Sequence, residues 1–283
     1  DSSQIEARML AHVAGQLDLE EAFRRGEDVY SEFATKVYGR TVTKADKADR
    51  FVGKTCILGL GYGMGHAKFR DTLKIEADIE IDEEEAKRIV YLYRNTYPKI
   101  TELWNRCDAL LNDMISGQSG VVGNFIGYSP DGIVLPNGMV LRYNALNLDP
   151  NNGYQYIADS RGFSKFIASR VVAKTTTIDI DGSDVEVCDL SGIAWTNIYG
   201  GKVVENIIQA LARIVISEQM TAVGQHYHVV FQVHDEIIIC AGADDASKAQ
   251  QVMERIMSVP PIWATTLPVA CESGIGDNFG ECK

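Results

Sequence analysis

The spacing of apolar residues along the chain predicts that its first part is mostly helical. In residues 3–14, Ile5, Met9 and Val13 recur at the interval that places them on one face of a helix. Later stretches show the same spacing, and one of them is interrupted around Pro98. The helices expected on this basis cover residues 3–14, 18–39, 45–60, 83–116, 161–175, 203–222 and 243–258.

Strand signals are concentrated in the second half of the chain. Between residues 120 and 190, Gly, Asn and β-branched residues become frequent, and Pro-Asp-Gly at 130–132 and Pro-Asn-Gly at 136–138 mark turns. Residues 228–240 have the pattern of a strand, a tight turn and a second strand, and a last strand is expected near 267–272. This mixture predicts an α+β fold with an antiparallel sheet flanked by helices.

Length and composition are those of a globular protein with a sizeable core. The chain has 283 residues, of which 46% are apolar and 23% charged, and its apolar runs are too short or too charged to cross a membrane. Residues 1–10 do not resemble a signal peptide. We therefore expect one large or two ordinary domains and no membrane partner.

The net charge is −12, which disfavours binding of nucleic acid by the whole surface. Such binding would need a local basic face or a second polypeptide. Cations are concentrated in residues 36–54, whereas residues 76–85 carry seven carboxylates. We interpret the acidic run as a solvated loop and helix start, with a metal site as the alternative.

The six cysteines lack the close spacing of a zinc site. None forms a CxxC or CxxH pair, so most are expected to be reduced, buried and small hydrophobic residues. This usage predicts a cytoplasmic protein. The cysteines are residues 56, 107, 188, 240, 271 and 282.

The sharpest local signal is the sequence His234-Asp235-Glu236 between two apolar strands. Carboxylates are costly near a core unless they are paired or bound to a metal. An Asp-Glu hairpin turn exposed to water is the alternative. A second signal is the Asp1–Glu6 segment, whose carboxylates flank a strand-to-helix transition and which could also be a helix N-cap.

A third signal is a stripe of four residues at intervals of four positions. Arg50, Lys54, Leu58 and Tyr62 fall along one face of the expected helix. Two cations followed by an apolar and an aromatic residue suit a nucleotide, since the cations can meet phosphates and the ring can meet a base. A basic solvated face running into a packed tyrosine is the alternative.

Along the chain, the signals come in the order of the Asp1–Glu6 segment, the stripe from Arg50 to Tyr62, and His234–Glu236. In this order they resemble motifs A, B and C of family A DNA polymerases, the DNA polymerase I-like enzymes. The resemblance extends over essentially the whole chain. Further stretches are similar to the helix before motif C, to the bacteriophage branch and to the closing segment of the family. These stretches are residues 205–210 (ENIIQA), 28–30 (DVY), 199–202 (YGGK) and 274–283 (GIGDNFGECK).

The resemblance implies template-directed DNA synthesis with two Mg²⁺ ions. Asp1 and Asp235 match the two metal-binding aspartates, and the main-chain carbonyl of Ser2 would complete a metal shell. Glu236 matches an auxiliary carboxylate, and His234 would lie near the primer terminus.

The resemblance also implies roles in nucleotide and DNA binding. Arg50 and Lys54 match cations on the phosphates of the incoming dNTP, and Lys54 could protonate the leaving pyrophosphate. Glu6 matches a steric gate against the ribose 2′-hydroxyl, Leu58 matches the residue that packs against the sugar, and Tyr30 occupies the position of a phosphate contact. Tyr62 would stack on the template. Gln209 would contact the minor groove of the primer–template DNA, and Lys202 lies where a duplex contact is expected.

The implied architecture is a right-hand polymerase without a thumb. Residues 1–13 and 190–283 would form the palm, and residues 14–189 the fingers, with a strand-rich insertion near 120–190. In this family the thumb and any exonuclease precede motif A, so we expect a portion of a longer or split polymerase that has little activity alone. Two alternatives are a single-subunit RNA polymerase and a non-catalytic DNA-binding subunit with the same fold.

Overall fold

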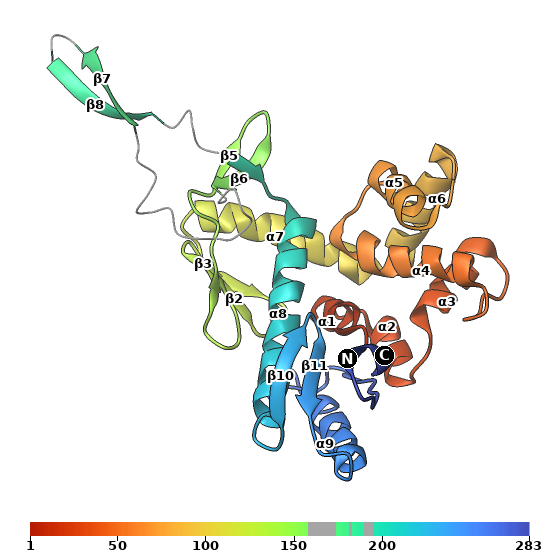
Figure 1. Ribbon diagram of the computed structural model, residues 1–283. Coiled ribbons are helices and arrows are strands. Elements are labelled where there is room, and N and C mark those ends of the chain that lie inside the picture. Colours follow the sequence, from red (N-terminus) through yellow and green to blue (C-terminus); the bar gives the residue numbers. More distant parts are fainter. Residues whose placement is uncertain (158–173, 181–182, 190–194, 283) are drawn as a thin grey trace.

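The computed structural model describes residues 1–157, 174–180, 183–189 and 195–282 (Figure 1). Its helices follow the apolar spacing of the sequence and occupy the first 115 residues and two later segments. They are α1 (Ile5–Ala14), α2 (Leu17–Arg24), α3 (Val29–Tyr38), α4 (Lys47–Gly59), α5 (His66–Ala77), α6 (Glu83–Thr96), α7 (Pro98–Ile115), α8 (Gly200–Val223) and α9 (Ala246–Met257), with short 3₁₀ turns η1 (Leu60–Tyr62) and η2 (Phe279–Glu281).

Every strand pair in the described part is antiparallel, and the sheets are small. β1 (Gly120–Val122), β2 (Ile126–Ser129), β3 (Gly132–Val134) and β4 (Val140–Leu141) form one sheet in chain order. The others are β5 (Asn147–Asp149), β6 (Gly153–Ile157) and β9 (Trp195–Asn197) in one sheet, the hairpin of β7 (Lys174–Ile180) and β8 (Ser183–Asp189), and the hairpin of β10 (His228–Val233) and β11 (Glu236–Cys240). The α+β class is therefore confirmed.

One hydrophobic core extends through most of the molecule. It runs from Ile5 to Leu267 and includes fully buried residues of α1, α3, α4, α7 and α8. Only a small separate cluster of Ile216, Ile237 and Met257 joins α8, β11 and α9. Figure 1 shows α8 running alongside the β10–β11 hairpin, with α1 and α2 beside them and α3 and α4 further out. The hairpin thus rests on far less buried surface than the helical part.

Two of the expected helical stretches are each divided in two, and α5 (His66–Ala77) was not expected at all. The stretch 18–39 is divided into α2 and α3, because Gly26 adopts a left-handed conformation with φ of 70°. The stretch 83–116 breaks at Tyr97, which confirms the interruption expected around Pro98, and Pro98 begins α7, where its missing N–H costs nothing.

Two further expectations had mixed outcomes. The helix expected at 161–175 falls mainly on residues 158–173, which lie outside the described residues, and Lys174 already belongs to β7. The strand expected near 267–272 is reduced to a single antiparallel bridge between Ser2 and Cys271.

The acidic run at 76–85 is exposed, as expected for a solvated loop. Asp82 caps α6 by accepting a hydrogen bond from the backbone N–H of Glu85 at 2.8 Å. Within the described residues, no helix is both long and apolar enough to cross a membrane. The cysteines whose side chains the structure describes, residues 56, 107, 240, 271 and 282, are free thiols. Of these five, Cys56 and Cys107 alone are buried, so the expectation that most are buried was wrong.

Candidate active site

The first residues of the chain lie against the turn of the β10–β11 hairpin. The backbone N–H of Ser2 donates to the carbonyl of Asp235 at 3.1 Å, and the N–H of Ser3 donates to the carbonyl of Ala270 at 3.0 Å. Asp1 closes the arrangement, because its carbonyl accepts from the N–H of Glu272 at 3.0 Å. Segments from opposite ends of the chain therefore place Asp1 and Asp235 side by side.

Two left-handed residues shape this junction. Gln4, immediately before α1, has φ of 56°, and His234, in the hairpin turn, has φ of 51°. Two-residue hairpin turns favour positive φ, but a histidine in that region costs energy that glycine would not. The Gln232 side chain stabilises the turn by donating to the carbonyl of His234 at 2.7 Å. Such strain is found most often at functional sites.

A cleft of about 900 Å³ opens between this junction and α1, α3, α4 and α8. Nine of the residues predicted from the sequence line it. They are Asp1, Glu6, Tyr30, Arg50, Lys54, Leu58, Gln209, His234 and Asp235. The structure therefore brings most of the predicted catalytic and nucleotide-binding residues into one cavity.

Four predicted residues do not line the cleft. Ser2 is fully buried, and its carbonyl accepts from the N–H of Ile5 at 3.3 Å. Lys202 forms an ion pair with Glu205 at 2.8 Å. Glu236 faces a second cavity of about 460 Å³ below the hairpin. The roles predicted for these residues stay predictions.

Tyr62 is the fourth of these residues, and it packs behind the cleft. Its hydroxyl donates to Glu6 Oε2 at 3.3 Å, and burial holds the pKa of the phenol well above its usual value. Trp104 fixes the neighbouring backbone by donating to the carbonyl of Gly61 at 2.8 Å. In this arrangement Tyr62 supports Glu6 and does not present its ring to the cleft.

The basic wall of the cleft contains two cations with different surroundings. Arg50 Nε and Nη2 donate to Asp28 Oδ2 and Oδ1 at 2.7 and 3.0 Å. Burial disfavours the ionised Asp28, but the hydrogen bonds from Arg50 and Ser31 outweigh it and hold the pKa of Asp28 below its usual value. Lys54 is exposed, and no carboxylate of the described chain forms an ion pair with it.

The opposite wall is acidic. Burial raises the pKa of Glu6; the Tyr62 hydroxyl acts in the opposite sense, and the nearby Asp235 and Glu205 raise it further. Like charges that face one another favour the arrival of a cation or the uptake of a proton. This wall therefore suits a positively charged ligand.

The carboxylates of this wall are chemically suitable for Mg²⁺. No group of three or more His, Cys, Asp or Glu side chains poised to enclose a metal occurs within the described residues. Mg²⁺, however, is usually held by one or two carboxylates together with water and substrate phosphates, and not by a cage made of protein alone. The adjoining Asp1 and Asp235, both facing the cleft, fit that requirement.

Several cleft residues were not predicted from the sequence. Arg213 lies one turn after Gln209 on the same face of α8, and this four-residue spacing was the available signal. Glu272 comes next to Asp1 only through the fold, and no local pattern marks it. Asp28 was visible as an acidic residue before a helix, but its pairing with Arg50 was not.

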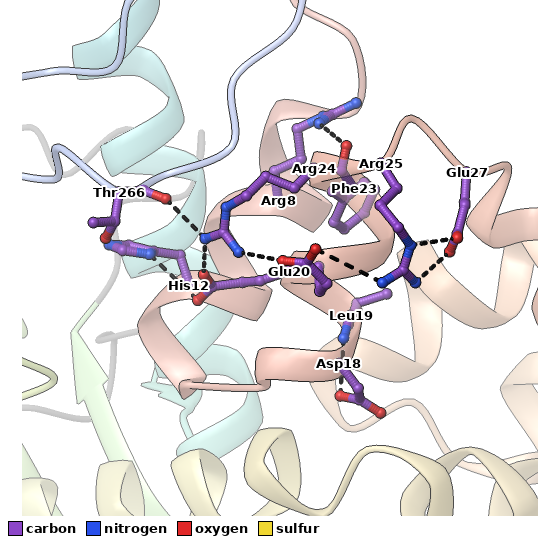
Figure 2. A network of polar contacts seen from close by, with 11 residues as sticks. Arg8, His12, Asp18, Leu19, Glu20, Phe23, Arg24, Arg25, Glu27 and Thr266 are labelled. Atoms are coloured by element: carbon purple, nitrogen blue, oxygen red, sulfur yellow. Dashed lines mark hydrogen bonds and ion pairs between the residues drawn. The ribbon is translucent and has the colours of Figure 1, made fainter.

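Behind the cleft, α1 and α2 are joined by a polar network (Figure 2). The buried Arg8 donates to the carbonyls of Ser3, Phe23 and Pro268 at 2.7, 3.4 and 3.0 Å. Figure 2 also shows the Arg24 side chain bridging Glu20 and the carbonyl of Thr266. These contacts tie the segment that carries Asp1 to the rest of the molecule.

Comparison with known proteins supports the resemblance seen in the motifs. Residues 1–115, from the Asp1 junction to the end of α7, match the model of DNA polymerase family A. This part of the chain is similar to the family A DNA polymerases. The resemblance recognised from the motifs is therefore confirmed.

The chain has similar polymerases that match over all or part of its length. It is 22% identical over 284 residues to a thermostable DNA polymerase I of Thermus filiformis, covering 100% of the chain and 27% of that protein. A DNA polymerase I of Helicobacter pylori is 36% identical over 106 residues, which cover 38% of the chain and 11% of that protein. The DNA polymerase of Bacillus phage SP02 is 26% identical over 294 residues, covering 99% and 40%. The chain thus spans less than half the length of these relatives.

The fold is similar to that of a solved polymerase domain. The POL domain of Pol1 from M. smegmatis, in complex with DNA primer-template and dNTP, superimposes with a TM-score of 0.52 at 18% identity. The match covers 95% of this chain and 38% of that one. It confirms the right-hand polymerase fold that the motifs implied.

Proposed function

We propose that this chain carries the nucleotidyl-transfer site of a template-directed DNA polymerase. The observation that supports it most directly is the junction of Ser2 and Asp235, which sets two aspartates side by side in a cleft whose other wall is basic. A primer 3′-hydroxyl and the triphosphate of a dNTP need this combination of acidic and basic groups.

In this proposal Asp1 and Asp235 hold two Mg²⁺ ions. Bound there, the metals would activate the primer hydroxyl and neutralise charge on the triphosphate and the leaving pyrophosphate. The protein contributes the placement of the two carboxylates, which the backbone hydrogen bonds of residues 1–3 secure. Glu236 follows Asp235 directly and would adjust the field around the site without binding a metal itself.

The basic wall would hold the triphosphate. Arg50 keeps its charge, because its hydrogen bonds to Asp28 hold the pKa of the guanidinium above its usual value. Lys54, which has no ion-pair partner in the described part of the chain, has a proton to transfer, so it would protonate the pyrophosphate as it leaves. Tyr30 would add a phosphate contact from the same wall.

The remaining cleft residues would select and align the substrates. Glu6, held by Tyr62, would occupy the space of a ribose 2′-hydroxyl, and Leu58 would pack against the sugar. Gln209 and His234 would contact the primer end of the DNA, with Gln209 checking the shape of the base pair. Stacking of Tyr62 on the template would require it to leave Glu6.

The division into palm (residues 1–13 and 190–283) and fingers (residues 14–189) remains part of the proposal. So does the partnership with primer–template DNA, dNTP and the upstream polymerase portion, and so does a cytoplasmic site of action. The relatives are much longer than this chain, so activity is best measured in the polypeptide that carries these 283 residues in its natural context.

The test is the substitution Asp235→Asn, which preserves shape and removes one metal-binding charge. We expect primer extension to fall about 1,000-fold, corresponding to about 4 kcal/mol of lost transition-state stabilisation. Binding of primer–template DNA, measured by fluorescence anisotropy, should stay within about twofold because phosphate contacts dominate it.

A matched control is Asp131→Asn, which makes the same change in the exposed turn between β2 and β3. It should leave extension unchanged. Extension by the Asp235→Asn protein within tenfold of the parent would show that Asp235 does not hold the catalytic metal.

A further inference from the structure

We propose that Asp28 is a positioning residue for Arg50, so that the nucleotide-binding cation is oriented before the nucleotide arrives. This inference rests on the proposed function. It concerns a side chain that binds neither metal nor nucleotide and acts only through its partner.

The first support is the geometry of the ion pair. Asp28 accepts two hydrogen bonds from the edge of the Arg50 guanidinium, at 2.7 and 3.0 Å, and the Ser31 hydroxyl donates to the same carboxylate at 2.7 Å. Two parallel N–H···O bonds fix a guanidinium in its own plane, which a single bond would not do. Both side chains are largely shielded, with 28% of Arg50 and 18% of Asp28 exposed.

The second support is a contact on the face of the guanidinium. Arg50 Cζ lies 5.2 Å from the centre of the Tyr30 ring, within range of a cation–π interaction. Tyr30 is itself 7% exposed, so it is held in place by the core. The carboxylate fixes the plane of the guanidinium, and the ring fixes its tilt. The N–H groups that Asp28 does not use remain available to an anion in the cleft.

The third support is the packing of α3 against α4, which makes the pair possible. A Cβ atom at Gly53 would lie 2.1 Å from the carbonyl oxygen of Tyr30, so only glycine allows this approach. Gly53 comes one turn after Arg50 on α4, and Asp28 directly precedes α3. The close approach therefore brings Asp28 and Arg50 within reach of one another.

Preorganisation of this kind has a kinetic signature. A guanidinium that is already oriented binds the triphosphate without losing further side-chain freedom. A carboxylate that merely tied α3 to α4 would affect stability, but its loss would not act through Arg50. The two roles are separated by comparing Asp28→Asn in the presence and absence of Arg50.

The experiment measures single-nucleotide incorporation by the polypeptide that carries this chain. With Asp28→Asn we expect the KM for dNTP to rise about fivefold to tenfold while kcat stays within about twofold. With Arg50→Ala already present, Asp28→Asn should change neither quantity further, because a residue that acts through another shows full coupling in a double-mutant cycle. Asp49→Asn, the same change at the position next to Arg50, is the control and should have no effect.

Two results with Asp28→Asn would overturn the inference. An unchanged or lower KM in Asp28→Asn would show that Asp28 does not assist Arg50, and an equal effect in the Arg50→Ala background would show that it acts elsewhere. A parent protein without any incorporation would instead overturn the proposed function itself. If Asp28→Asn does not fold, as judged by circular dichroism, Ser31→Ala replaces it. This variant should raise the KM about twofold to threefold, and an unchanged KM would count against the inference.

Discussion

The two walls of the cleft satisfy their charges in opposite ways. On the basic wall, Arg50 is paired with Asp28 and stacked on Tyr30, so its charge is compensated within the fold. On the acidic wall, Asp1, Glu6 and Asp235 share one cavity, and repulsion from Asp235 adds to the effect of burial in raising the pKa of Glu6. The charge of Arg50 is therefore compensated by the protein alone, whereas the acidic wall becomes favourable only when positive charge arrives.

The walls also differ in what supports them. α3 and α4 belong to the large core, in which Phe33 and Val52 are fully buried. The hairpin that presents Asp235 rests on the small cluster of Ile216, Ile237 and Met257. The part of the acidic wall that presents Asp235 thus has less hydrophobic support, which agrees with the general finding that functional sites lower stability.

The largest effect is expected for Lys54, the cation of the basic wall that has no ion-pair partner in the described part of the chain. Replacing Lys54 by Ala removes a proton donor from the basic wall, so we expect kcat for nucleotide incorporation to fall about 100-fold. Lys47→Ala, at an exposed position of the same helix outside the cleft, is the control. A Lys54→Ala protein with unchanged kcat would remove Lys54 from the mechanism.

A smaller effect is expected from divalent ions on the acidic wall. Mg²⁺ at ten times its dissociation constant should raise the melting temperature by about 2 °C, because it binds only the folded state. Asp235→Asn should abolish most of this shift, and KCl at equal ionic strength should not reproduce it. An equal shift in the parent and in Asp235→Asn would place the ion elsewhere.

The smallest effect concerns the protonation of Glu6. The folded state holds the pKa of Glu6 above its unfolded value, so ionisation destabilises the fold as the pH rises through the raised pKa. Glu6→Gln removes this penalty, and because the side chain is only partly buried we expect a gain of about 1–2 °C in melting temperature at pH 7.

The same Glu6→Gln difference should disappear below the ordinary carboxyl pKa of about 4.3, where the parent residue is protonated in both states. Melting curves of both proteins across this pH range provide the measurement. A difference that persisted at low pH would point to the Tyr62 contact as the cause.

Much of the fold could be predicted because its elements are defined by local spacing. The helix expected at 45–60 is α4, and the strand–turn–strand expected at 228–240 is the β10–β11 hairpin. The last strand was wrong in extent, because residues 270–272 form only an isolated bridge with residues 1–3 and no longer ladder. That outcome depends on contacts between the two ends of the chain, which periodicity does not report.

The candidate site likewise has a part that local spacing predicts and a part that depends on contacts between segments far apart in the chain. Residues that share a motif, such as Arg50 and Lys54, could be placed together because helical spacing relates them. The pairing of Asp28 with Arg50 could not be predicted, because it depends on the approach of two helices. The position of Tyr62 behind Glu6 likewise depends on how η1 packs against α1.

The glycine contact between α3 and α4 also bears on how the cleft can close. With the backbone of Gly53 pressed against Tyr30, sliding of one helix over the other would bring backbone atoms into clash, so we expect α3 and α4 to move together. A rotation of α4 toward the hairpin would carry α3 with it, and the bending would fall in the short link after α2, where Gly26 already has the freedom that a hinge requires.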